Sequence, residues 1–94
     1  MRPRKKPNLA PRLAACAPVV IQSPEEKKGR IREEFPNPGA PLYLELGCGK
    51  GAFICALASL HPEINFVAME KEANVAVIAT ERAMEARLPN LRFI

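Results

Sequence analysis

The fold is decided by the stretch LYLELGCGKG, which runs from Leu42 to Gly51. Its first half is apolar apart from Glu45, and this predicts a short buried strand. Its second half places three glycines in five residues, so the backbone can turn sharply or let a ligand come close, because no Cβ stands in the way. Residues 52–58 (AFICALA) follow with a helical pattern. A strand, a glycine-rich turn and a helix in this order are typical of a site for a nucleotide-containing cofactor, with backbone N–H groups at the helix start facing the ligand.

The rest of the chain repeats this alternation. We expect strands at 42–46, 65–70 and 91–94 and helices at 51–60 and 73–87. Strands that alternate with helices of this length predict right-handed βαβ units and a parallel sheet, so the expected fold class is α/β in the order βαβαβ. Three strands make one half of a doubly wound sheet, and the chain stops inside the third. A natural terminus rarely lies in the buried core of such a sheet, so we interpret the sequence as the N-terminal fragment of a larger protein.

The residues before this unit divide into two segments. Residues 1–22 are predicted to be a basic, largely disordered arm, because the first twelve hold five basic residues, three prolines and no acid. Residues 23–41 are predicted to form a helix and a linker rich in proline and glycine. Ser23 is a candidate N-cap for this helix, which would reach about Phe35. Residues 42–94 then form a partial cofactor-binding domain.

The charge is distributed unevenly along the chain. Residues 1–32 carry nine Lys or Arg against two Glu, whereas residues 33–94 carry five against eight. A basic arm on a mildly acidic domain indicates a polyanionic partner, with nucleic acid as the first candidate, although a solvated tail would show the same charge.

The cysteine content restricts both the compartment and the metal chemistry. The three cysteines, Cys16, Cys48 and Cys55, show no C-x-x-C spacing, and there is a single histidine. This argues against a disulfide framework and against a metal site, and it fits the reducing cytoplasm. No apolar run is long enough to predict a transmembrane segment.

Three nucleotide-binding motifs are compared with the sequence of the glycine turn. A phosphate-binding P-loop requires a longer glycine spacing and a Ser or Thr after its Lys, and here the Lys is followed by glycine. A dinucleotide fingerprint, G-x-G-x-x-G/A, is satisfied by Gly47, Gly49 and Ala52. The third motif, E/D-x-G-x-G-x-G, is typical of methyltransferases that use S-adenosylmethionine, and the stretch from Glu45 to Gly51 fills every position.

Glu45 decides between the last two motifs. An unpaired carboxylate beside the turn would repel a pyrophosphate by roughly a few kcal/mol in a partly buried site. S-adenosylmethionine has no phosphate; it presents a cationic amine and a sulfonium, which Glu45 suits, and a carboxylate that glycine-loop N–H groups can hold. Glu70 lies 23 residues after Gly47, at the end of the second expected strand, where an acid would bind ribose hydroxyls. Cys48 has no histidine near it in sequence, so its expected role is steric.

Five segments carry a resemblance to a known family. They are RLAAC (12–16), PEE (24–26), LELGCGKG (44–51), FVAMEK (66–71) and NLRFI (90–94). Together they resemble the bacterial tRNA (guanine-N7-)-methyltransferase family over almost the whole chain. The resemblance implies a class I, Rossmann-like sheet, S-adenosyl-L-methionine as cofactor and methylation of a guanine in the variable loop of tRNA. It also implies that Glu45 and Gly47 hold the methionine end of the cofactor, with Gly49 in the same turn, and that Glu70 binds the ribose.

The resemblance further implies what this chain lacks. The family's catalytic aspartate and its tRNA-contacting residues come after later strands, and this chain contains no aspartate. No catalytic residue is therefore assigned within residues 1–94. Two alternatives stay open: a nicotinamide-binding oxidoreductase, which the dinucleotide fingerprint allows, and a non-catalytic RNA-binding module that uses the basic arm. Aromatic residues make up 5% of the chain and none lies in the arm, so base stacking has little support.

We expect residues 1–94 alone to be poorly stable and inactive, because half a sheet leaves the first strand without its other neighbour and exposes an apolar edge. Thermal unfolding followed by circular dichroism, together with a methyl-transfer assay on the isolated chain, measures both properties. A cooperative unfolding transition combined with measurable methyl transfer would refute this expectation.

Overall fold

The computed structural model describes residues 7–94, so the expected contribution of Arg2, Arg4, Lys5 and Lys6 to a basic arm lies outside the described residues. The elements are α1 (Leu9–Ala15), the 3-10 helices η1 (Ala17–Val19), η2 (Pro24–Lys27) and η3 (Ile31–Glu34), then β1 (Leu42–Leu46), α2 (Ala52–Leu60), β2 (Asn65–Met69), α3 (Ala73–Ala86) and β3 (Leu91–Phe93). The strands form one parallel sheet in the order β1-β2-β3, which confirms the α/β class and the βαβαβ order. Within the described residues, no helix combines the length and the apolar character needed to cross a membrane.

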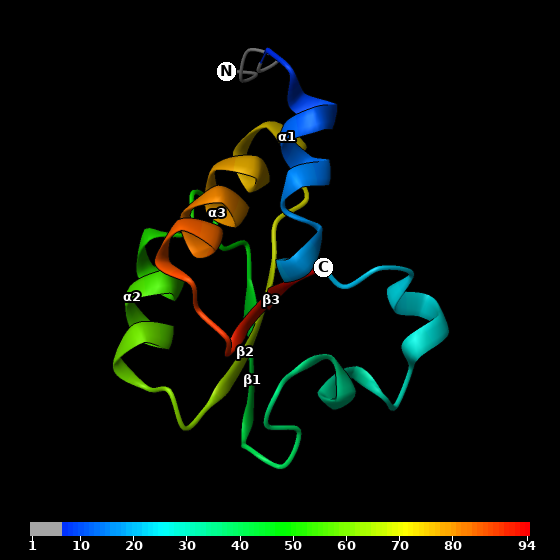
Figure 1. The fold of residues 1–94 in the computed structure, drawn as a ribbon, viewed down its shortest axis with the longest axis vertical. Helices are drawn as coiled ribbons and strands as arrows, with labels where there is room; N and C mark the ends of the chain where they lie inside the picture. The colour runs from blue at the N-terminus through cyan, green and yellow to red at the C-terminus, as the bar shows by residue number, and fades with distance from the viewer. Residues whose placement is uncertain (1–6) are drawn as a thin grey trace.

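One face of the sheet carries the main core. In the parallel register Tyr43 lies beside Phe66, and Phe66 lies beside Leu91, so these side chains share a face. Figure 1 shows α2 and α3 packed against each other on one side of the strands. The buried cluster joins side chains of the strands, of both helices and of the N-terminal segment: Cys16, Val19, Ile54, Cys55, Ala58, Phe66, Ala68, Ala79, Ala83, Leu91 and Phe93. Removal of this apolar area from water is the main stabilising contribution in the unit.

The opposite face of the sheet is covered only in part. Val67 packs there with Ile21 and Phe35 in a second, smaller buried cluster. On β1, the side chains of Leu44 and Leu46 are 57% and 70% exposed, and within the described part of the chain β1 pairs with β2 alone. The interpretation of β1 as a buried strand is therefore wrong here, because an edge strand with a single neighbour keeps much of its surface in solvent.

A bidentate ion pair joins α1 to α3. Arg12 donates from Nε and Nη2 to the two carboxylate oxygens of Glu81, at 2.8 and 2.6 Å. Such a bidentate pair fixes the guanidinium in one orientation. The hydrogen bond from Arg12 also holds the pKa of the Glu81 carboxyl below its ordinary value. The stabilisation is therefore fully present above the ordinary carboxyl pKa and is lost as the pH falls through the lowered one.

The segment after α1 continues along the edge of β3. Cys16, Val19 and Ile21 are buried, and the Ile21 amide donates to the Phe93 carbonyl at 2.8 Å. The expectation of a largely disordered arm up to residue 22 is therefore wrong from α1 onwards, because burial of these side chains offsets the cost of ordering the backbone. The division of the chain into three separate units stays a prediction.

The single helix expected from Ser23 to about Phe35 is also wrong. The segment forms two separate 3-10 turns, η2 and η3, and Gly29 between them has a φ of +77°. Ser23 has a left-handed backbone with a φ of 48°, and its side chain makes no capping hydrogen bond. A glycine in the middle of so short a segment weakens α-helix propagation, so the chain forms two single turns instead.

Gly51 lets α2 and α3 approach closely. It precedes α2 with a φ of +83°, and a Cβ at this position would lie 2.8 Å from the Cβ and 2.9 Å from the Cα of Ala79. Carbon atoms in ordinary contact lie roughly 3.5–4.0 Å apart, so a side chain here would push α3 away. The third glycine of the turn therefore serves helix packing.

We expect Gly51→Ala to lower the free energy of unfolding by about 2–5 kcal/mol, because it adds overpacking against α3 to the cost of a left-handed backbone. Gly29→Ala is the matched control. Its φ is +77°, but no other described atom lies within 4 Å of its would-be Cβ, so only the backbone cost of about 1–2 kcal/mol should appear. Urea unfolding of the full-length protein measures both losses, and equal losses would contradict the packing role of Gly51.

Candidate functional site

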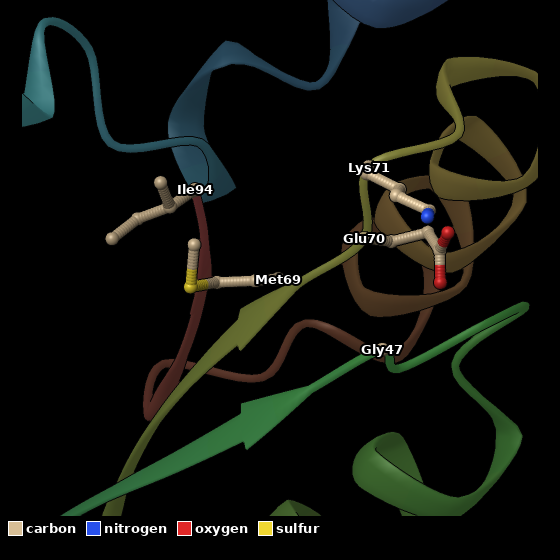
Figure 2. Close-up of a pocket in the computed structure, with 5 residues that line it drawn as sticks. All are labelled: Gly47, Met69, Glu70, Lys71 and Ile94. Carbon is tan, nitrogen blue, oxygen red and sulfur yellow. The ribbon is translucent and has the colours of Figure 1, made fainter.

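The carboxyl ends of β1, β2 and β3 meet at one edge of the sheet, as parallel pairing requires. An open hollow of about 370 Å³ lies at this edge, and Figure 2 shows the residues that line it: Gly47, Met69, Glu70, Lys71 and Ile94. The side chains of Met69 and Ile94 lie together on one side, whereas Glu70 extends toward the other (Figure 2). Because ligands of open α/β sheets bind outside the carboxyl ends of the strands, this hollow is the candidate site.

Two amides of the glycine turn fix the turn to the end of β2. Gly47 and Cys48 both donate their N–H groups to the carbonyl oxygen of Met69, at 2.8 and 3.0 Å. Gly47 and Gly49 have φ values of +70° and +59°, a left-handed conformation that residues with a side chain rarely adopt. Among the described residues, no further atom comes within 4 Å of a Cβ built on either glycine. Both positions therefore leave open space beside the backbone.

The carboxylate of Glu70 joins this turn to the start of α3. Its Oε1 atom accepts the Gly49 N–H at 2.9 Å, and its Oε2 atom accepts the Glu72 N–H at 3.1 Å. Glu72 is the residue directly before α3. The structure thus brings together three of the four residues that the sequence marks for cofactor binding, namely Gly47, Gly49 and Glu70.

Glu45, the fourth of these residues, lies beside the site and does not line the hollow. It pairs with Ala68 in the register of β1 and β2, and it shares a face with Tyr43, two residues before it. Its side chain is partly exposed. The negative charge of Glu45 still acts on the turn. Burial and the charge of Glu70 raise the pKa of the Cys48 thiol, and the charge of Glu45 raises it further.

Most amides of the glycine turn already donate within the chain. Gly47, Cys48 and Gly49 donate to acceptors at or directly after the end of β2. The Gly51 amide donates to the Cys48 carbonyl at 3.1 Å. Of the turn amides, at most that of Lys50 is then left to bind a ligand. This differs from the expectation that glycine-loop N–H groups are free to hold a ligand carboxylate. The N–H groups in the first turn of α2 have no partner inside that helix, so they are the better candidates.

Sequence reasoning missed two apolar members of the site, Met69 and Ile94. Both lie where a strand ends, and the Ile94 amide donates to the Ala68 carbonyl at 3.0 Å. The signal available in the sequence was the position of each residue at the end of an expected strand, because neighbouring parallel strands end at the same edge. Within residues 7–94, no three His, Cys, Asp or Glu side chains form a group that could hold a metal ion.

Cys48 shows no sign of activation as a nucleophile. Burial raises the pKa of its thiol, and the neighbouring charge of Glu70 raises it further. The Sγ atom lies 3.7 Å from the carbonyl oxygen of Gly49. Because a raised pKa disfavours the reactive thiolate, these features are consistent with the steric role expected from the sequence.

A parallel βαβαβ unit with a glycine turn and an acidic residue at its carboxyl edge defines a Rossmann-like domain of the class that binds nucleotide-containing cofactors. Residues 39–94 of this chain match the family model described as "Putative methyltransferase". The chain belongs to this methyltransferase family, and its fold agrees with that membership.

Relatives with curated names are similar over the full length of the chain. The tRNA (guanine-N(7)-)-methyltransferase of Lactococcus lactis subsp. cremoris (strain MG1363) is 43% identical over 94 residues, which make up 100% of this chain and 43% of that protein. Proteins of the same name from Halalkalibacterium halodurans and Listeria innocua serovar 6a are 46% and 42% identical over 94 residues, and the chain covers 42% and 44% of their lengths. The chain therefore spans less than half the length of the relatives it matches.

We expect the Cys48 thiol to react slowly with iodoacetamide at neutral pH and to approach the rate of a free thiol only at higher pH. The reason is that its pKa is raised and the thiolate is the reacting form. Peptide mass spectrometry of the folded full-length protein distinguishes it from Cys16 and Cys55, and a short cysteine peptide provides the reference rate. Alkylation of Cys48 faster than this peptide at neutral pH would favour a nucleophilic role instead.

Proposed function

We propose that the complete protein is a tRNA (guanine-N7-)-methyltransferase that uses S-adenosyl-L-methionine, and that residues 1–94 supply the donor-binding half. The observation that carries the proposal is the contact of Glu70 with the glycine turn, at the carboxyl edge of a sheet that belongs to a methyltransferase family. The names of the relatives, which are similar over the whole chain, support the choice of tRNA as substrate.

Three polar parts of the donor, namely its ribose hydroxyls, its amine and its carboxylate, have a matching group in the chain. The Glu70 carboxylate can accept hydrogen bonds from the ribose hydroxyls. Glu45 supplies a charge opposite to that of the donor's amine. Gly47 and Gly49 allow the ligand to come close to the backbone, and the N–H groups in the first turn of α2 suit the donor's carboxylate.

The proposed reaction requires little acid–base chemistry from this half of the protein. When bound, the donor would supply an activated methyl group: the lone pair of guanine N7 would form the new N–C bond while the C–S bond of the sulfonium breaks and leaves a neutral thioether. The residues of this chain hold the donor in place, and alignment of the two reactants contributes most of the rate enhancement. The proposal therefore needs no catalytic residue within residues 1–94.

The charge distribution supports a tRNA partner. Residues 1–32 carry nine Lys or Arg against two Glu. Arg12 is already paired with Glu81 at 2.6 Å and Lys27 with Glu34 at 3.3 Å, so phosphate attraction would come mainly from the other cations. Such contacts release counterions and make binding salt-dependent without base specificity. Modification of tRNA by a protein with three free cysteines fits a cytoplasmic location.

We expect Glu45→Gln to weaken S-adenosylmethionine binding by the full-length protein about 10- to 100-fold, because the variant loses a charged partner for the donor's amine. Isothermal titration calorimetry measures the change. Glu85→Gln is the matched control, since it removes the same charge from an exposed position on α3, and it should bind the donor as the wild type does.

Titrations of the full-length protein with NAD and with tRNA, together with a methyl-transfer assay, separate the rival functions. Gly47, Gly49 and Ala52 also fit a dinucleotide fingerprint, so tight binding of NAD by the wild-type protein would overturn the choice of cofactor. Binding of tRNA without methyl transfer would favour a non-catalytic RNA-binding module.

A further inference from the structure

We infer that Glu70 is a positioning residue that fastens the glycine turn to the start of α3 before any ligand binds. This fastening is a property of the ligand-free protein, whereas its consequence for the donor rests on the proposed function. The residue would then have two tasks at once, one toward the protein backbone and one toward the ribose.

The two hydrogen bonds of Glu70 connect separate parts of the chain. Gly49 lies in the turn between β1 and α2, and Glu72 ends the connection between β2 and α3. The carboxylate accepts one N–H from each of them, at 2.9 and 3.1 Å. Hydrogen bonds to an ionised group are roughly twice as strong as neutral ones, and a negative charge near the start of a helix is favourable. One side chain therefore holds the two connections at a fixed distance.

The hydrogen-bonding capacity of the carboxylate allows this task to coexist with ligand binding. A carboxylate offers about four lone-pair positions, and the amides of Gly49 and Glu72 occupy two of them. About two remain, which is the number that the two vicinal hydroxyls of a ribose require. Glu70 can thus bind a diol without giving up either backbone contact, and the turn needs no reordering when the ligand arrives.

The two backbone contacts restrict the type of residue at position 70 more strongly than a ribose contact alone would, and they favour Glu. Glutamine has a single carbonyl oxygen, and its NH₂ group would face one of the two N–H donors. Aspartate is shorter by one methylene, so its oxygens would not occupy the positions from which Glu70 accepts both amides. Alanine removes both acceptors.

Amide hydrogen exchange measured by NMR on the ligand-free full-length protein tests the inference. In the wild type, the amides of Gly49 and Glu72 should be protected. In Glu70→Ala both should exchange about 10- to 100-fold faster, and in Glu70→Gln one of the two should do so while the other keeps its protection. Glu85→Gln, which removes a charge from an exposed position on α3, should leave both rates unchanged.

Two results would overturn the inference. Fast exchange of the Gly49 amide in the wild-type protein would overturn it. This result needs no variant, so it can be obtained even if the substitutions prevent folding. Unchanged exchange of Gly49 in Glu70→Ala would do so as well. A titration with S-adenosylmethionine separates this inference from the proposed function: protected amides without donor binding would refute the function and support the positioning role, whereas donor binding with an unprotected Gly49 would refute the positioning role alone.

Discussion

The carbonyl oxygen of Met69 accepts two successive amides of the glycine turn, and the rest of the site depends on this contact. Gly47 and Cys48 both donate to it, so the turn lies directly against the end of β2. Glu70 is the next residue along the chain, so its carboxylate can accept the Gly49 N–H of the turn directly. The parallel register of β1 and β2 sets this arrangement. A shift of one residue would turn the acid to the opposite face of the sheet.

The parts of the fold that could be predicted from sequence depend on local signals. Apolar runs of strand length alternate with helical segments, and this pattern was sufficient to predict the parallel sheet and the order of its elements. Glycine spacing placed the turn after β1, and the position of Glu70 at the end of β2 placed an acid at the same edge. The hydrogen bond between Glu70 and Gly49 could not be predicted, because it depends on the register of two strands and not on spacing along the chain.

The parts that differ from prediction depend on contacts between distant residues. Basic residues and prolines favour disorder near the N-terminus, yet Arg12 meets Glu81 and the Ile21 amide meets the Phe93 carbonyl. Neither partner can be recognised from the composition of the N-terminal segment itself. The exposure of Leu44 and Leu46 has a related cause, because the burial of a strand depends on how many neighbours it has and not on its own apolar residues.

The hydrogen bond between Ile21 and Phe93 joins a segment near the N-terminus to the last strand of the described chain. A ribosome releases a chain from its N-terminal end at about 5–20 residues per second, so the segment that contains Ile21 emerges well before β3 is made. Until then it has no edge of β3 to pair with, and Cys16, which is buried in the folded unit, lacks the β3 side chains of its cluster, Leu91 and Phe93. The first ordered segment of this chain to be synthesised is therefore among the last to gain its contacts.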